Sequence, residues 1–429
     1  MKKREFGSTG KKTSLIGLGG GQFAGSEHSV EEIKEIVQTA LDNGVNFIDT
    51  ARDYGEDRLG EALKRTEGEY FISSKTLAKN KEDALEDVHR SLKKLNQDKI
   101  DFYFMHNPMS VEDYRHRKRE GVLEALKKAR EQGLVDCIGI SCDYVEPLEL
   151  AVEDNVDVIM PHYNVGNTLA EDIIEKSSNR GVGVVAAKSF AGGILVDSKP
   201  GVEEGKENEM TPDKSLKFTL SNENISTVLV GARYPWQIKE CAEVGKNFDP
   251  EEVDQEKIKK HVFDFLGNNF CRDCRYCWPC EELGYEFDIP EILRFLDRYE
   301  KYGFKRFSRI EFSKLPYKEK INDAGKCDFE CPFGIDVLKR LKTADEKLEL
   351  EVSQEQWIEK LREKQGEVNN KTVQEINFLK ELSKNEAIEK IHSELIPSGK
   401  VDEKLGILLI EGIHSFGVEE VLENLEVPK

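Results

Sequence analysis

The stretch Phe47-Ile48-Asp49-Thr50-Ala51-Arg52-Asp53-Tyr54-Gly55 shows the pattern that decides the fold, a short apolar run that ends in polar residues. Similar runs recur through about the first 245 residues, and amphipathic stretches of helical period follow them. We count eight runs: Ser14–Leu18, Asn46–Thr50, Tyr70–Lys75, Asp101–Met105, Asp136–Ser141, Asp157–Met160, Val182–Ala187 and Thr227–Val230. The helical stretches include Val30–Leu41, Lys81–Leu95, Val122–Glu131 and Leu169–Ser178.

Eight strand–helix repeats predict an α/β fold, a closed parallel (β/α)8 barrel of the TIM type. A doubly wound open sheet is the competing arrangement, but it usually needs fewer repeats. Glycines follow several helices before the next strand, as in Asn43-Gly44, Gln132-Gly133 and Arg180-Gly181, where glycine suits a helix C-cap. The glycine-rich stretch Gly17–Gly21 matches neither a dinucleotide fingerprint nor a P-loop, so we expect a tight turn at the end of a strand rather than a phosphate cradle.

The chain of 429 residues is long enough for more than one domain. We expect the barrel over residues 1–245, a small α-helical cysteine-rich segment over 246–345, and a helical C-terminal extension over 346–429. No chemical motif stands out after residue 345, so the role of the extension is not apparent.

The composition is that of a globular protein with an acidic surface, with 38% hydrophobic and 34% charged residues and a formal net charge of −20. Nucleic acid and anionic membranes are unexpected partners, because both select clustered lysine and arginine. No run approaches the length of a membrane span, and the N-terminus lacks the apolar run of a signal peptide. We therefore expect a cytoplasmic protein.

Four side chains near the ends of successive strands form a candidate catalytic group. Asp49, Lys75 and His106 end the second, third and fourth runs, and Tyr54 follows Asp49. The carboxyl ends of barrel strands meet at one face, where the chemistry of such barrels takes place. A phenol is a weak acid near neutral pH, and an adjacent ammonium is expected to lower its pKa. Tyr54 would then protonate a carbonyl oxygen to which His106 donates a hydrogen bond, while Asp49 orients Lys75.

Each of these residues has a structural explanation when taken alone. A strand-end aspartate often caps the next helix, a lone lysine is usually a surface charge, and a lone histidine or tyrosine is usually a structural residue. The combination of all four, each at the position that the barrel predicts, favours catalysis.

The same motifs resemble the aldo-keto reductases. They are Phe47–Ala51 with Tyr54-Gly55, Ser74-Lys75, His106 after an aromatic strand, and the opening Arg4–Gly10 followed by Ser14–Gly20. The similarity covers about residues 1–245. It implies a (β/α)8 barrel, NADP(H) or NAD(H) bound without a Rossmann domain, Tyr54 as proton donor, and Asp49, Lys75 and His106 as the rest of the catalytic tetrad.

The resemblance also implies residues that bind the cofactor: Ser141 at the nicotinamide carboxamide, Tyr163 in a Tyr-Asn pair that follows along the chain, Lys188 at the pyrophosphate, and Gly231, Arg233 and Gln237 at the adenosine end. Arg233 favours NADP, because arginine suits a 2′-phosphate, although it also fits a simple surface residue. The chain departs from the common family pattern at Cys142, Met160 and Cys241, where Asn, Gln and Asn are frequent.

Six of the nine cysteines lie between residues 271 and 331. Cys271, Cys274, Cys277 and Cys280 are spaced C-x2-C-x2-C-x2-C, and Cys327 and Cys331 form C-x3-C before a proline. This spacing is typical of a ferredoxin-type iron-sulfur site. Zinc is the alternative, although zinc ribbons usually separate two C-x2-C pairs.

A branch of the aldo-keto reductases carries a C-terminal ferredoxin-like segment with two four-cysteine motifs, and this chain resembles that branch with its second motif shortened. Six cysteines cannot complete two all-cysteine 4Fe-4S clusters, so we expect one cluster. In ferredoxins the cysteine before proline serves the cluster of the other motif. This points to Cys271, Cys274, Cys277 and Cys331 as ligands, with Cys280 and Cys327 left over. Use of Cys280 in place of Cys331 is the alternative.

Together these observations predict an NAD(P)H-dependent oxidoreductase that reduces an aldehyde or ketone, or oxidises the alcohol, and that carries an iron-sulfur cluster. The cluster would be structural or would face a redox protein partner. The competing hypothesis is a non-catalytic or weakly catalytic protein for electron transfer or partner binding on the same barrel. The sequence does not indicate the substrate.

Overall fold

The computed structural model describes residues 1–24, 28–196, 211–277, 283–284, 287–313, 315 and 318–348, and a few residues between 378 and 409. The chain divides into two compact units. One comprises Met1–Val196, Met210–Gly267 and Arg272–Tyr276, and the other comprises Asp197–Glu209, Asn268–Cys271 and Cys277–Lys429. Most of the expected extension at 346–429 lies outside the described residues. Within the described residues, no helix has the length and apolarity that crossing a bilayer requires.

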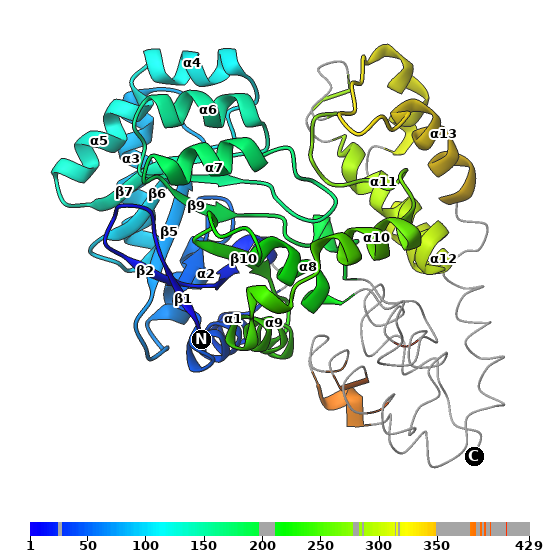
Figure 1. Ribbon diagram of the computed structural model, residues 1–429, viewed down its shortest axis with the longest axis horizontal. Coiled ribbons are helices and arrows are strands. Elements are labelled where there is room, and N and C mark those ends of the chain that lie inside the picture. Colours follow the sequence, from blue (N-terminus) through cyan, green and yellow to red (C-terminus); the bar gives the residue numbers. More distant parts are fainter. Residues whose placement is uncertain are drawn as a thin grey trace. The chain divides into compact units, whose positions relative to one another are not determined.

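The first unit contains a closed barrel of eight parallel strands in the order β10-β3-β4-β5-β6-β7-β8-β9, which confirms the barrel and excludes the open sheet (Figure 1). Each strand overlaps one of the eight apolar runs. The strands are β3 (Ile16–Gly19), β4 (Phe47–Asp49), β5 (Phe71–Thr76), β6 (Ile100–His106), β7 (Val135–Cys142), β8 (Val158–Pro161), β9 (Gly183–Ala186) and β10 (Thr227–Gly231).

Helices surround these strands in the first unit (Figure 1). They are α1 (Val30–Asp42), α2 (Glu56–Leu63), α3 (Lys81–Leu95), α4 (Val111–Arg119), α5 (Val122–Glu131), α6 (Val145–Glu153), α7 (Glu171–Asn179), α8 (Pro212–Leu220), α9 (Pro235–Asn247) and α10 (Gln255–Leu266). Gly44, Gly133 and Gly181 all have positive φ, as expected for glycines that terminate helices. The glycine-rich stretch ends β3 and continues as the short 3-10 helix η1 (Gly20–Phe23), the expected turn.

A hairpin of β1 (Lys3–Glu5) and β2 (Lys12–Ser14) precedes the barrel. Phe6 lies between these strands and packs against Phe47 and Phe102, with ring centroids 6.0 and 4.5 Å away. Lys11 pairs with Asp101 and Asp136, near the amino ends of β6 and β7, at 3.0 and 2.8 Å. The hairpin therefore covers the amino end of the barrel and leaves the carboxyl end for the loops that follow the strands.

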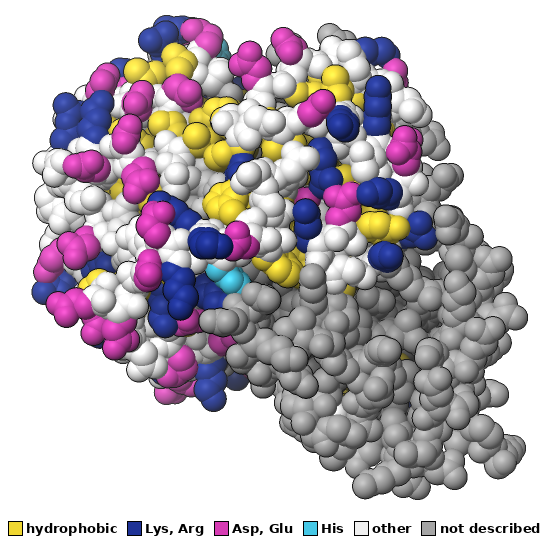
Figure 2. Space-filling model, turned by 45° about the vertical axis from the view of Figure 1, so that its right-hand side comes forward, with side chains coloured by type: hydrophobic (Ala, Val, Ile, Leu, Met, Phe, Trp, Pro, Cys, Tyr) yellow, Lys and Arg dark blue, Asp and Glu magenta, His cyan; other side chains and the backbone are white. Residues whose placement is uncertain are grey.

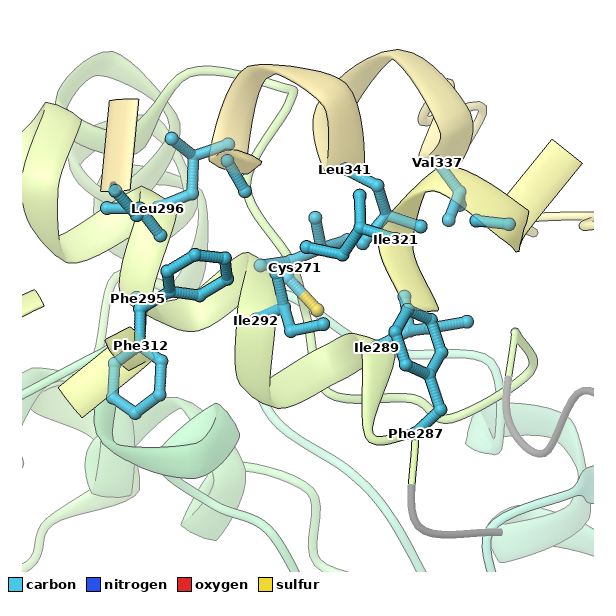
Figure 3. Close-up of a cluster of buried hydrophobic side chains, with 14 of the residues drawn as sticks. Cys271, Phe287, Ile289, Ile292, Phe295, Leu296, Phe312, Ile321, Val337 and Leu341 are labelled. Carbon is cyan, nitrogen blue, oxygen red and sulfur yellow. The ribbon is translucent and has the colours of Figure 1, made fainter. Parts of the chain in front are cut away.

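The second unit has a separate apolar core. Its described helices are α11 (Ile289–Asp297), the π-helix η4 (Arg298–Tyr302), α12 (Lys305–Ser313), the 3-10 helix η5 (Lys318–Lys326) and α13 (Val337–Leu348). Apolar side chains from these helices form one cluster that also contains Cys271 (Figure 3). Cys327 belongs to the same cluster, and Cys277 and Cys331 pack against it. Among the residues that the structure describes, the named elements of this unit are all helices.

Candidate active site

A buried ion pair joins the ends of two neighbouring strands. Lys75 of β5 places its Nζ 2.7 Å from both carboxylate oxygens of Asp49, which ends β4. The same ammonium donates to the carbonyl of Thr50 at 2.7 Å, and Ser73 Oγ donates to Asp49 at 2.6 Å. Both charged side chains are almost completely buried, with exposures of 3% and 5%. These hydrogen bonds compensate the loss of water around both charges and fix the position of the ammonium.

Tyr54 lies against this pair. Its ring centre is 5.2 Å from Lys75 Nζ, and the ring of His106 stands perpendicular to it at a centroid distance of 6.0 Å. The backbone places Tyr54 here through a turn in which its N–H donates to the carbonyl of Ala51 at 2.9 Å, and Gly55 follows with a left-handed φ of +77°. The structure therefore brings the four predicted catalytic residues together at the carboxyl ends of β4, β5 and β6.

The pKa of Tyr54 differs from the sequence-based expectation. We expected the ammonium of Lys75 to lower it, whereas burial raises the pKa of Tyr54 above its usual value. The carboxylates of Asp49, Asp53 and Asp143 raise it further, and Arg275 opposes them. The physical reason is that burial, the largest effect, disfavours the charged phenolate. The hydroxyl of Tyr54 thus stays protonated across the neutral range.

His106 is held by its backbone and stays neutral. Its carbonyl accepts a hydrogen bond of 2.9 Å from Arg117 of α4, whose guanidinium also pairs with Asp113. Burial lowers the pKa of His106 to about 3, and Lys75 lowers it as well. A neutral imidazole has one N–H to donate and one nitrogen that accepts. Its Nδ1 is buried without a hydrogen-bond partner among the described residues.

A second polar group follows the next strands, and sequence reasoning missed it. Asp143, directly after β7, accepts from His162 Nε2 at 2.9 Å and from Asn107 Nδ2 at 3.1 Å. Burial acts to raise the pKa of Asp143, but His162, Arg275 and Lys188 outweigh it and lower the pKa. The rule of polar residues at strand ends would have found this group, because His162 directly follows β8 and Asn107 directly follows β6.

Three of the expected cofactor-binding residues, Ser141, Lys188 and Tyr163, differ from one another in their positions and contacts. Ser141 of β7 pairs in register with His106 of β6, which puts it at the same end of the barrel as the tetrad. Lys188 follows β9 with a positive φ of +56° and pairs with Asp273. Tyr163 is buried; its hydroxyl donates to Glu171 of α7 at 3.3 Å, and its ring stacks on Phe218 of α8. The hydroxyl of Tyr163 is therefore directed to the helix layer.

The expected adenosine-side residues form one connected turn after β10. Gly231 ends this strand, and the backbone N–H of Arg233 donates to Gln237 Oε1 at 2.8 Å. Arg233 Nε donates to Gln22 Oε1 at 3.0 Å, which ties the turn to the loop after β3. A Cβ atom on Gly231 would come within 3.1 Å of the side chain of Gln22, so the close approach favours glycine.

The three residues that depart from the common family pattern are buried. Met160 belongs to the apolar cluster inside the barrel, and the thiol of Cys142 donates to the carbonyl of Pro108 at 3.1 Å. Cys241 lies on α9 and is 3% exposed. Packing inside the fold accounts for all three side chains.

The cysteine motif is only partly described. Cys271 and Cys274 are buried, Cys277 and Cys331 are partly exposed, and Cys280 lies outside the described residues. Among the residues that the structure describes, no cluster of three or more His, Cys, Asp or Glu side chains has an arrangement that would hold a metal ion. Cys271, Cys274, Cys277 and Cys331 are all among these described residues, so the structure does not bring three or more of the four expected ligands together around one metal position, and the iron-sulfur cluster stays a prediction.

Comparison with known proteins agrees with the barrel and its carbonyl chemistry. L-galactose dehydrogenase of Arabidopsis thaliana is 25% identical over 293 residues, which cover 60% of this chain and 92% of the relative. D-threo-aldose 1-dehydrogenase of a Pseudomonas species is 25% identical, over 50% of this chain and 83% of the relative.

A solved aldo-keto reductase of Bacillus halodurans in its holo form superposes with a TM-score of 0.53 at 23% identity, over 61% of this chain and 96% of that structure, which supports the fold. The model of the Aldo/keto reductase family matches residues 15–261, more than half of the chain. Small carbonyl compounds and NAD(P)H are typical of this family. The chain therefore belongs to the aldo/keto reductase family of oxidoreductases.

Proposed function

We propose that the protein reduces an aldehyde or ketone, or oxidises the corresponding alcohol, with NADP(H) as cofactor and Tyr54 as general acid. The observation that carries this proposal is the grouping of Tyr54, the Lys75–Asp49 ion pair and His106, with Nζ of Lys75 5.2 Å from the centre of the Tyr54 ring. A proton donor, a fixed cation and a neutral imidazole at one point suit a carbonyl oxygen that becomes negative.

The roles of the side chains follow from their protonation states. Tyr54 keeps its proton in the resting site, because burial raises its pKa. As negative charge builds on a substrate oxygen, Tyr54 gives up this proton, and the ammonium of Lys75 stabilises the phenolate that remains. Neutral His106 donates its N–H to the same oxygen. The nicotinamide cofactor, when bound, supplies the hydride.

The cofactor-binding residues fit their expected roles in part. Ser141 lies next to His106 in the strand register, which suits a contact with the carboxamide. Lys188 and Arg233 are the cations assigned to the diphosphate and the 2′-phosphate, and Gln237 holds the turn that carries Arg233. The hydroxyl of Tyr163 donates to Glu171 in the helix layer, so we assign Tyr163 a packing role beside this site.

Substitution of Tyr54 by Phe tests the mechanism. We expect Tyr54→Phe to lower kcat for NADPH-dependent carbonyl reduction by about 10²-fold or more, since it removes the acid but keeps the ring. The dissociation constant of NADPH, measured by fluorescence titration, should stay within about twofold of the wild type, because no proton transfer occurs on cofactor binding. Unchanged turnover in the variant would contradict the assignment of Tyr54.

The cysteine motif forms the second part of the proposal, a single 4Fe-4S cluster on Cys271, Cys274, Cys277 and Cys331. Cys327 is disulfide-bonded, so it does not compete as a thiolate. Cys271, Cys277 and Cys331 all lie in or against the apolar core of the second unit, which suits a soft, thiolate-bound group. The backbone N–H of Cys271 is fixed by a 2.7 Å hydrogen bond to the buried carboxylate of Asp297.

The backbone of the first motif also suits this group. Asp273 and Arg275 have φ values of +51° and +65° within the loop from Cys271 to Cys277. Left-handed residues form one half of the nest conformation, which turns backbone N–H groups to one side and is common at iron-sulfur sites. The cluster would serve as a structural centre or would exchange single electrons with a protein partner.

Metal analysis after anaerobic purification tests the cluster. We expect a brown protein with about four iron and four sulfide per chain, and loss of both in Cys274→Ser, because that variant lacks one thiolate. Cys137→Ser is the matched control, since Cys137 is buried in the barrel core. A colourless protein with one zinc per chain would refute the cluster and support the alternative metal.

A further inference from the structure

The segment between the first and third cysteines of the motif contacts the barrel. Arg272–Tyr276 belongs to the first unit. The hydroxyl of Tyr144 donates to the carbonyl of Arg275 at 3.3 Å, and the backbone N–H of Val145 donates to the hydroxyl of Tyr276 at 3.1 Å. The rings of Tyr144 and Tyr276 are 5.0 Å apart. Both barrel residues follow β7, so this segment lies at the catalytic end of the barrel.

An ion pair links the same segment to the predicted cofactor site. Lys188 Nζ lies 2.6 Å from Asp273 Oδ2, and the side chain of Asp273 is completely buried. Arg275 Nε is 3.6 Å from the other carboxylate oxygen of Asp273. A buried carboxylate needs such partners, because removing one would leave an uncompensated charge. The pair is therefore a built feature of the fold and not a chance surface contact.

Both residues of this ion pair have an uncommon backbone conformation. Seven described residues other than glycine have positive φ. Asn96 and Asn155 end or follow helices, where asparagine tolerates this conformation. The others lie after β6, after β9 or in the cysteine loop, and they are Asn107, Lys188, Ala191, Asp273 and Arg275. Such conformations persist where surrounding contacts hold them, and they concentrate at functional sites.

We propose that Asp273 is a positioning residue of the reductase site, which holds the ammonium of Lys188 where the cofactor diphosphate binds. This inference rests on the proposed function. A lysine side chain has many rotamers, and a buried carboxylate at 2.6 Å selects one of them before the cofactor arrives. An ammonium has three N–H donors, so the two that do not point to Asp273 are available to phosphate oxygens.

Through Asp273, the cysteine motif takes part in binding the cofactor of the barrel. Asp273 stands between Cys271 and Cys274, so the residues that bind the proposed cluster and the residue that orients Lys188 share one short segment. Cofactor affinity, rather than the proton-transfer step, is then the property that this segment controls.

The dissociation constant of NADPH in the anaerobically purified full-length protein tests the proposal. We expect Asp273→Asn to raise it by about tenfold, because Lys188 loses its charged partner and its fixed position. The value of kcat at saturating NADPH should change less than twofold, since the tetrad is untouched. Asp273→Glu should recover part of the affinity. If Asp273 had only a structural role, Asp273→Asn would instead lower stability and kcat together, and the loss would not be confined to NADPH affinity.

A double-mutant cycle checks that Asp273 acts through Lys188. Lys188→Met should weaken NADPH binding, and adding Asp273→Asn to it should cause no further loss. Asp136→Asn is the matched control, because it removes a carboxylate from a lysine pair at the amino end of the barrel. Unchanged or tighter NADPH binding in Asp273→Asn, or additive effects in the cycle, would overturn the proposal.

Two further readouts keep the proposal separate from the function on which it rests. If Asp273→Asn does not fold, the other two variants decide. NADPH affinity equal to the wild type in both Lys188→Met and Asp273→Glu overturns the proposal. Weakened NADPH affinity in Lys188→Met, with a partial loss in Asp273→Glu, supports it. Wild-type protein that binds neither NADPH nor NADH contradicts the proposed function itself. Wild-type protein that binds NADPH, with unchanged affinity in the variants, contradicts the role of Asp273 alone.

Discussion

The sequence predicts that Lys75 lies at the end of a strand, but it does not predict the electrostatic environment of this side chain. Its ammonium is shared among the two oxygens of Asp49 and the carbonyl of Thr50, all at 2.7 Å. Burial and the carboxylates of Asp49, Asp53 and Asp143 raise the pKa of Tyr54, so its phenol keeps its proton in the resting site. The residue types follow from the motif, but the balance between burial and charge depends on distances that only the folded chain defines.

His106 provides a pH test at the same scale. Its pKa of about 3 in the folded protein lies below the value of about 6.5 for an unfolded histidine. Between these values the unfolded chain binds the extra proton, so the stabilising contribution is present above about pH 6.5 and is lost as the pH falls towards 3. The free energy of unfolding of the wild type minus that of His106→Asn is the quantity to measure. We expect this difference to fall by about 3 kcal/mol from pH 7 to pH 4.

Urea unfolding of both proteins over this pH range measures the difference. The variant keeps every other titrating group, so the comparison isolates the imidazole. A difference that does not change with pH would show that His106 is not buried as a neutral group.

At the scale of elements, the β1–β2 hairpin closes the amino end of the barrel with a single aromatic side chain. Phe6 is completely buried against Phe47 and Phe102, and a Cβ atom on Gly183 would come within 2.3 Å of its ring. The glycine at this position of β9 thus makes room for Phe6. The hairpin supports the barrel from the end opposite the four candidate catalytic residues.

Truncation of Phe6 should therefore lower stability and spare catalysis. We expect Phe6→Ala to reduce the free energy of unfolding by about 3–5 kcal/mol, because it leaves a cavity among aromatic rings. Phe6→Leu retains more of the apolar volume and should cost less. Urea unfolding measures the loss, and KM for NADPH should match the wild type below the unfolding transition. A large rise in KM in Phe6→Ala would contradict the separation of the two ends.

At the scale of the whole molecule, the chain combines a family barrel with a second unit that has its own apolar core. On the face in Figure 2, acidic and basic side chains are interspersed over the described surface, although the net charge is −20. The predicted division at residue 245 followed the end of the strand–helix repeats. In the structure α10 extends the first unit to Gly267, and Arg272–Tyr276 also belongs to it. Sequence periodicity could not place this segment, because its contacts are with loops distant along the chain.

The sequence by itself determined the barrel, the four catalytic candidates and the family, because apolar periodicity and strand-end polar residues depend on local order along the chain. The tertiary structure alone decided the raised pKa of Tyr54, the Asp143–His162 pair and the placement of Tyr163 against α7. It alone joined Asp273 of the cysteine motif to Lys188 after β9. These features depend on burial and on pairs of charges far apart in sequence, which only the closing of the barrel brings within contact distance.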